Sequence, residues 1–242
     1  MNLAVMQPCY LPWRGYFALM KMADVFIHLD DVPLPQGRTY QTRIAIKTSH
    51  GRQWLSVPVH RESNQLICDV QIVDDGWRHK HRRTLAQQLP QSSPLVDDVY
   101  ERPWSHLAAL NIALADRLAD ALDIHRECRL SSEFRTHTAG WQKILDLCRA
   151  TGATRYITGH GARNYFDHEA FEAAGVDVMY LDYDLAPYPQ PHGDFDPFVS
   201  VLDVLAHAAH PADCIGARLV PWQEFLARTP TNHGEPAALP IT

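Results

Sequence analysis

The connection QPCYLPWRG near the start of the chain crowds prolines and aromatic rings directly behind a short apolar run. A loop that only turned the chain would favour Gly, Asn, Asp and Ser. Rigid prolines and rings can instead form a preshaped wall for a ligand, with Gln7 and Tyr10 supplying hydrogen bonds beside Trp13. The alternative is that Tyr10 and Trp13 plug the end of a sheet as core residues.

A second connection begins with the neighbouring carboxylates Asp30 and Asp31, which follow the run VFIHL. A close carboxylate pair suits Mg²⁺ binding or general-base chemistry. If the strand continues through both residues, their side chains point to opposite faces. At most one would then face a ligand, and the other would cap a turn.

The segment TGHGARNY places two glycines around an imidazole, in the turn formed by Gly159, His160 and Gly161. Glycines at this spacing before a helix let backbone N–H groups approach an anion. The alternative is a plain strand-to-helix turn, which also favours glycine.

The elements that position these segments are predicted by their apolar patterns. Strands at 2–7 and 24–31 flank a helix at 16–23, and this order predicts a right-handed βαβ unit with parallel strands. Ligands of such sheets bind beyond the carboxyl ends of the strands, where all three segments lie.

The last third of the chain returns to the same order of helices and strands. A helix at 139–150, capped by Thr138 and ended by Gly152, leads to a strand in TRYITGHG. A short helix in DHEAFEAAG, closed by Gly175, then leads to a strand in VDVMYLDYD. The sheet is therefore expected to hold at least four parallel strands.

The middle of the chain has a different pattern. The runs TRIAIKT, GRQWLSVPVH and ICDVQIVDD alternate and are separated by polar turns, which predicts an antiparallel meander inserted on the parallel core. Helices are expected at 79–89 and 106–122, the latter capped by Ser105. Its leucine stripe predicts a core-facing side: Leu107, Leu110, Leu114, Leu118 and Leu122.

The expected fold class is α/β, a mostly parallel Rossmann-like sheet flanked by helices, with a nucleotidyltransferase-like topology as a variant. We expect one domain over 1–229, with the β-rich insertion at about 38–76. The tail at 230–242 is rich in Pro and Thr and is expected to be weakly ordered.

Composition excludes several classes of protein. The formal net charge is -6 and no block of five or six basic residues occurs, which argues against nucleic acid as a partner and for a small-molecule substrate. The five cysteines are scattered without a C-x-x-C pair, so neither a disulfide framework nor a zinc finger is expected. With no signal sequence and no apolar stretch long enough to span a bilayer, we expect a cytoplasmic protein.

Other catalytic patterns are weak or missing. His79 and His81 would diverge on a helix, and His207 and His210 share a face without a cysteine or carboxylate beside them, so no metal site is expected. No G-x-S-x-G motif marks a nucleophile. The H-x-G-H motif of nucleotidyl-transferring α/β enzymes is also missing from YLPWRGY, where Arg14 or Lys21 would have to supply the charge.

Six segments together resemble the WbqC-like family: MQPCYLPWRGYF, ADVFIHLDDV, TRIAIKTSHGRQWLSVPV, WRHKHRRTL, YITGHGARNYF and YPQPHGDFDPFVSVLDVL. The resemblance spans about residues 2–206. It departs at Thr42, where the family often has Asn, and at AHAAH after LDVL, where a small Asn-Gly-like ending is usual. Substrate contacts at these two places are therefore open.

The resemblance implies a bacterial biosynthetic enzyme of O-antigen and other lipopolysaccharide or natural-product pathways. The leading hypothesis is acyl or aminoacyl transfer to the amine of an activated amino sugar or a related small molecule. The expected partners are a nucleotide-activated sugar and an acyl or aminoacyl donor, and no cofactor is assigned. The alternatives are nucleotidyl transfer or adenylation with ATP and Mg²⁺, and a non-catalytic binding module of a biosynthetic complex.

Roles for single residues also follow from the resemblance. Asp30, Asp31 or His81 would act as the general base, although His81 on a predicted helix also suits a capping or core position. Arg43 and Lys143 would hold an anion, with surface ion pairs as the alternative. Further positions that match the family's polar motif residues are Gln7, Tyr10, Trp13, Gly15, Tyr16, Trp54, Trp77, Ser131, Gly159, Gly161, Tyr165, Gln190, Ser200 and Asp203.

Overall fold

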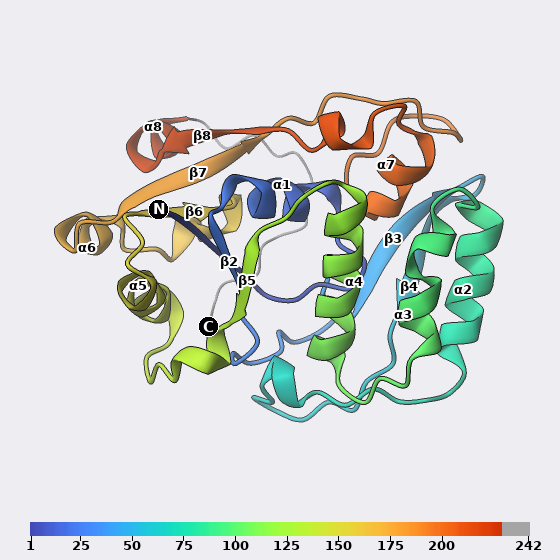
Figure 1. The fold of residues 1–242 in the computed structure, drawn as a ribbon, viewed down its shortest axis with the longest axis horizontal. Coiled ribbons are helices and arrows are strands. Elements are labelled where there is room, and N and C mark those ends of the chain that lie inside the picture. The colour runs from blue at the N-terminus through green and yellow to red at the C-terminus, as the bar shows by residue number, and fades with distance from the viewer. Residues whose placement is uncertain (229–242) are drawn as a thin grey trace.

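A computed structural model describes residues 1–228 of the chain. Its main sheet has six strands in the order β5-β2-β1-β6-β7-β8, and Figure 1 shows helices packed around it. All neighbours pair in parallel except β7 and β8, which are antiparallel. The predicted α/β class is therefore confirmed. The strands are β1 (Asn2–Met6), β2 (Val25–His28), β5 (Glu127–Leu130), β6 (Arg155–Thr158), β7 (Asp177–Tyr183) and β8 (Ala217–Pro221).

The centre of the sheet is the predicted βαβ unit. β1 and β2 are joined through α1 (Arg14–Met22), and Leu3 lies opposite Val25 in parallel register. Every residue of β2 is buried, which explains why its sequence is a continuous apolar run rather than an alternating one. The carboxyl ends of β1, β2 and β6 consequently lie on one edge of the sheet.

The insertion contains a two-stranded hairpin rather than the predicted three-stranded meander. β3 (Arg43–Thr48) and β4 (Gly51–Ser56) pair in antiparallel register, separate from the main sheet. The third run forms the 3₁₀ turn Ile67–Asp69. Near its start, the N–H of Cys68 donates to the carbonyl of Asp30 at 2.8 Å. Further on, Ile72 forms an isolated antiparallel bridge with Val59, and the N–H of Val73 donates to the carbonyl of Pro58 at 2.9 Å, so the run keeps one contact with the second run without forming a strand.

Two of the predicted helix caps are wrong. Helix α4 (Leu107–Ala121) begins after His106, and the hydroxyl of Ser105 lies 2.9 Å from Nδ1 of the His106 ring instead of capping the helix. Helix α5 (Gly140–Thr151) begins after Ala139, and Thr138 donates to Asp146. The leucine stripe of α4 is buried as expected.

Figure 1 shows α4 between β5 of the main sheet and the β3–β4 hairpin, with α2 and α3 beside the hairpin at one end of the molecule. No helix within residues 1–228 combines the length and the apolar character that crossing a membrane requires. The predicted weakly ordered tail lies outside the described residues. The other helices are α2 (Trp77–Gln88), α3 (Asp97–Glu101), α6 (His168–Ala173), α7 (Val201–His207) and α8 (Trp222–Ala227), and the 3₁₀ turns are Ser93–Val96, Ser131–Phe134, His160–Asn164 and Pro211–Cys214.

Candidate functional site

A pocket opens at the carboxyl ends of β1 and β6, the two central strands of the sheet. Its walls combine aromatic rings with a few polar groups, and the cavity volume is about 80 Å³. Apolar walls with a small number of converging polar groups are the usual make-up of small-molecule sites. The residues predicted from sequence that line it are Gln7, Tyr10, Trp13, Gly159, His160, Gly161 and Tyr165.

An amide pair joins the first loop to the inserted segment. Nε2 of Gln41 donates to Oε1 of Gln7 at 2.6 Å, and both side chains are buried in the pocket lining. Asn111 fixes the backbone on both sides of this amide pair, because its Nδ2 donates to the carbonyls of Gln41 and Pro8. Oε1 of Gln41 is buried, and no group in residues 1–228 donates to it. A donor from a ligand, such as an amine or a hydroxyl, would satisfy this oxygen.

The ring of Tyr10 forms part of the pocket wall, and its hydroxyl lies among buried side chains. The hydroxyl lies 2.8 Å from Nδ1 of His81 and contacts the hydroxyl of Tyr100. The ring of Trp77 packs edge-on against that of Tyr10. His81 does not line the pocket, and burial lowers its pKa from 6.5 to about 4. The geometry therefore makes His81 a support of Tyr10, and its role as a base stays a prediction.

Trp13 packs against Tyr183 and Phe198, with ring centroids 5.1 and 5.3 Å apart. Gly15 permits this placement, because a Cβ at that position would lie 2.2 Å from the Trp13 ring. Any side chain at position 15 would therefore clash with Trp13, which explains why this motif position is a glycine in this chain.

His160 is the imidazole that lines the pocket. Its Nε2 lies 2.8 Å from the carbonyl of Leu181 and must donate, because a carbonyl only accepts. In the neutral ring, Nδ1 therefore carries the lone pair. The ring packs against Tyr183 and Phe225, and a Cβ on the adjoining Gly159 would lie 2.8 Å from the Tyr183 hydroxyl.

Asp30 and Asp31 lie apart from this lining, in a polar cluster with Ser131 and Lys143. The hydroxyl of Ser131 contacts both carboxylates, so the two aspartates converge rather than pointing to opposite faces. The reason is that β2 ends at His28, and strand alternation no longer applies to them. Nζ of Lys143 lies 2.8 Å from the carboxylate of Asp31.

The Asp30 carboxylate has additional partners in the turn that follows β5. It accepts from the backbone N–H of Ser132 at 3.0 Å and from its hydroxyl at 2.8 Å. Lys143 also donates to Thr136 at 2.8 Å. The cluster thereby ties the end of β2 to β5 and α5, and its catalytic role stays a prediction.

Arg43 and Gln190 also lie outside the pocket lining. The guanidinium of Arg43 stacks 4.0 Å from the ring centre of Trp54. Gln190 accepts from Lys47 at 3.0 Å and donates to Asp203 at 2.8 Å. These contacts fix the loop after β7 against the hairpin.

Sequence reasoning missed several lining residues. Thr158 ends β6 directly before the glycine turn, so its position at a strand end was a usable signal. Gln41 and Tyr40 belong to the loop before β3, and nothing in their local pattern marks them. They reach the pocket because the insertion folds back over the first loop, where the N–H of Tyr10 donates to the carbonyl of Tyr40 at 2.9 Å.

Comparison with known proteins matches residues 7–213 to the model of the WbqC-like protein family. The chain belongs to the WbqC-like family. A curated relative, the uncharacterized protein Rv1507c of Mycobacterium tuberculosis, is 32% identical over 214 residues, covering 84% of this chain and 92% of its own length. No solved structure matches the chain. The matched range of the family contains every pocket residue predicted above.

Proposed function

We propose that this WbqC-like protein is a cytoplasmic transferase that acylates the amine of a small acceptor, with an activated amino sugar as the acceptor class. The observation that carries the proposal is the unpartnered, buried Oε1 of Gln41 in an aromatic pocket that also holds the imidazole of His160. Aromatic walls suit the apolar face of a sugar ring, and an amide oxygen suits an amine donor.

The chemistry assigns a task to each group. The acceptor nitrogen forms a bond to the acyl carbon, while the bond between that carbon and its leaving group breaks. His160 takes the proton from the nitrogen at Nδ1, because Nε2 keeps its own proton for Leu181. The proton then passes to the leaving group. The Gly159–Gly161 backbone would face the negative charge that develops on the acyl oxygen.

This assignment moves the proposed base from Asp30, Asp31 and His81 to His160. None of the former three lines the pocket. In contrast, a general base must come within hydrogen-bond reach of the proton that it abstracts. None of the described pocket residues is a carboxylate, which favours acyl transfer over the Mg²⁺-dependent alternative.

The test uses nucleotide-activated amino sugars, each paired with an analogue that carries a hydroxyl in place of the amine. The wild-type chain is incubated with acyl thioesters or acyl phosphates, and amide product is followed by mass spectrometry. His160→Gln keeps a donor for Leu181 and should lower turnover by about 10²–10⁴-fold. The control His50→Gln alters an exposed imidazole outside the pocket lining and should leave turnover unchanged.

A binding module is the second candidate, favoured by the location of Asp30, Asp31 and His81 outside the pocket. It predicts binding of the amino sugar without any amide product. Wild-type turnover in His160→Gln would refute His160 as the base. If one of the separate variants Asp30→Asn, Asp31→Asn and His81→Gln also lost turnover, the role of general base would return to that residue, as the sequence predicted.

A further inference from the structure

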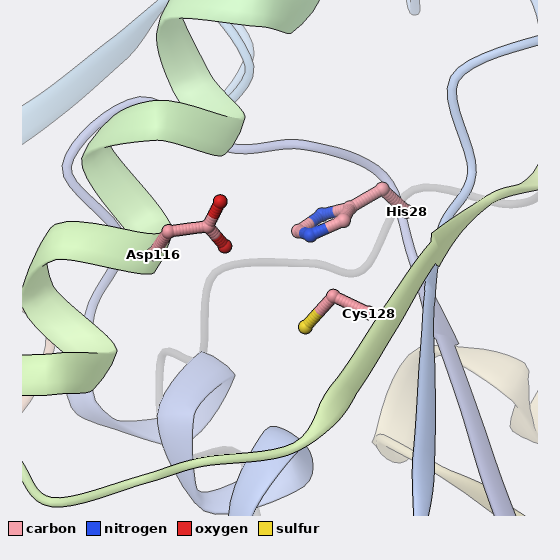
Figure 2. A group of neighbouring side chains, drawn as sticks. All are labelled: His28, Asp116 and Cys128. Carbon is pink, nitrogen blue, oxygen red and sulfur yellow. The ribbon is translucent and has the colours of Figure 1, made fainter.

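Three side chains that are distant in the sequence converge on the face of the sheet covered by α4. Figure 2 shows His28 from β2, Cys128 from β5 and Asp116 from α4 pointing toward one another. One ring nitrogen of His28, the sulfur of Cys128 and a carboxylate oxygen of Asp116 all lie within 4.8 Å of each other. The cluster is separate from the pocket described above, because none of the three lines it.

Strand register explains why the histidine and the cysteine meet. β2 and β5 pair in parallel with Phe26 opposite Cys128 and His28 opposite Leu130. Residues at alternate positions share a face of a sheet, so His28 and Cys128 project to the same side. Asp116 then approaches from the helix packed over that side, as Figure 2 shows.

The His28 ring has one satisfied and one unsatisfied nitrogen. Nδ1 lies 3.2 Å from the hydroxyl of Tyr16. His28 is only 1% exposed, so water does not reach Nε2, and this nitrogen has no hydrogen-bond partner among residues 1–228. A buried polar atom without a partner costs free energy, and native proteins rarely leave one in place. A histidine that binds a metal has this pattern, with its other nitrogen hydrogen-bonded to a neighbouring group.

The donor set selects the kind of ion. A thiolate, an imidazole and a carboxylate are the ligands of zinc, whereas Mg²⁺ and Ca²⁺ prefer oxygen alone. In a tetrahedral zinc site the ligand atoms lie about 3.3–3.8 Å apart, so the exposed Cys128 and Asp116 need only a small rotation toward His28.

A groove beside the cluster supplies access from solvent. Asp116 and Cys128 form part of its wall, with Met20, Asp120 and His125 around them. Its cavity volume is about 480 Å³, which is ample for water and small ligands. Three protein ligands with an open fourth position are the arrangement found in catalytic rather than structural zinc sites.

We propose that His28, Asp116 and Cys128 bind one Zn²⁺ ion, with the fourth coordination position open to this groove. The site departs from the expectation, drawn from the sequence, that the chain holds no metal. It does not depend on the proposed transferase activity, since the pocket of His160 is built from other residues.

The test uses the purified full chain, stripped of metal and titrated with Zn²⁺ and with Co²⁺ as a coloured substitute. We expect one ion per chain, and a thiolate-to-cobalt absorption band that zinc displaces. Cys128→Ala should abolish the band and weaken zinc binding by at least tenfold. The matched control Cys214→Ala removes a thiol from the turn Pro211–Cys214, which is neither part of the cluster nor of the groove wall, and should leave both unchanged.

A second readout is independent of colour. Saturating zinc should raise the melting temperature of the wild-type chain by about 5–10 °C at a hundredfold excess over Kd, and Mg²⁺ should not. Asp116→Asn alters an exposed side chain, so the variant should fold and lose most of this rise. Failure of the wild-type chain to bind zinc in a 1:1 ratio would overturn the proposal. Equal binding by Cys128→Ala, or recruitment of Cys214 instead, would also overturn it.

Discussion

Two groups of titratable side chains flank the end of β2, and they differ in how completely their members are paired. The cluster of Asp30, Asp31, Ser131 and Lys143 forms a connected network with bonds to each carboxylate and to the ammonium. The cluster around His28 leaves a fully buried nitrogen without a partner. Clustering of ionisable groups therefore does not by itself indicate a binding site. Incomplete pairing in a buried position is the more specific sign.

The comparison also shows two roles for residues at the end of β2. Residues beyond the end of β2 turn toward α5 and fasten three elements together. The last residue within β2, His28, turns toward Asp116 and Cys128, which line a solvent groove. If this distinction is correct, substitutions in the first cluster should affect stability, and substitutions in the second should affect ligand binding.

The largest expected effect is that of Lys143→Met. The ammonium is nearly buried, and its removal leaves the Asp31 carboxylate without its ion pair. We expect a loss of about 3–5 kcal/mol in the free energy of unfolding, measured by urea denaturation. The double variant Lys143→Met with Asp31→Asn should recover part of the loss, because no unpaired charge remains. A loss below 1 kcal/mol would show that the network is not structural.

Ser131→Ala removes the hydroxyl that contacts both aspartates. The side chain is fully buried, so water cannot replace the lost donor. Because hydrogen bonds to charged groups are strong, we expect a loss of about 2–3 kcal/mol by the same measurement. Ser132→Ala is the matched control, since Asp30 keeps the backbone N–H of that residue; its loss should be clearly smaller.

The buried histidine His81 extends the comparison to the pH dependence of stability. Its folded pKa of about 4 lies below the unfolded value of 6.5, so the unfolded chain takes up the proton first. The resulting stability is present above pH 6.5 and is lost as pH falls toward 4. Between pH 7.5 and 5 this amounts to about 2 kcal/mol. His81→Gln should flatten the dependence by that amount, and an unchanged slope would contradict the assignment.

Local patterns predicted the central strands and failed at the edges. β1, β2, β6 and β7 are apolar enough to be recognised alone, whereas β5, with the sequence ECRL, carries charges at alternate positions. It is a strand because the backbone of β2 offers a pairing partner, and β8 depends on β7 in the same way. Edge strands owe their structure to context more than to propensity.

The residues of the candidate site also differ in whether local sequence patterns could predict them. Residues at strand ends, such as Gln7 and His160, were predictable because parallel strands deliver their carboxyl ends to one edge. Gln41 was not, because only the folded insertion brings it over the first loop. His28, Asp116 and Cys128 show no spacing that marks a metal site, since strand register and helix packing bring them together.

The smallest effect on stability should be that of Cys128→Ala, and it is the sharpest test of the contrast between the clusters. The thiol is exposed on an edge strand and belongs to no hydrogen-bonded network among the described residues. In metal-free buffer, the free energy of unfolding should change by about 0.5 kcal/mol or less. With zinc present, the same variant should lack the rise in melting temperature seen in the wild-type chain. A large loss of stability without metal would place Cys128 in the packed core, and the distinction between a paired cluster and a ligand site would then fail.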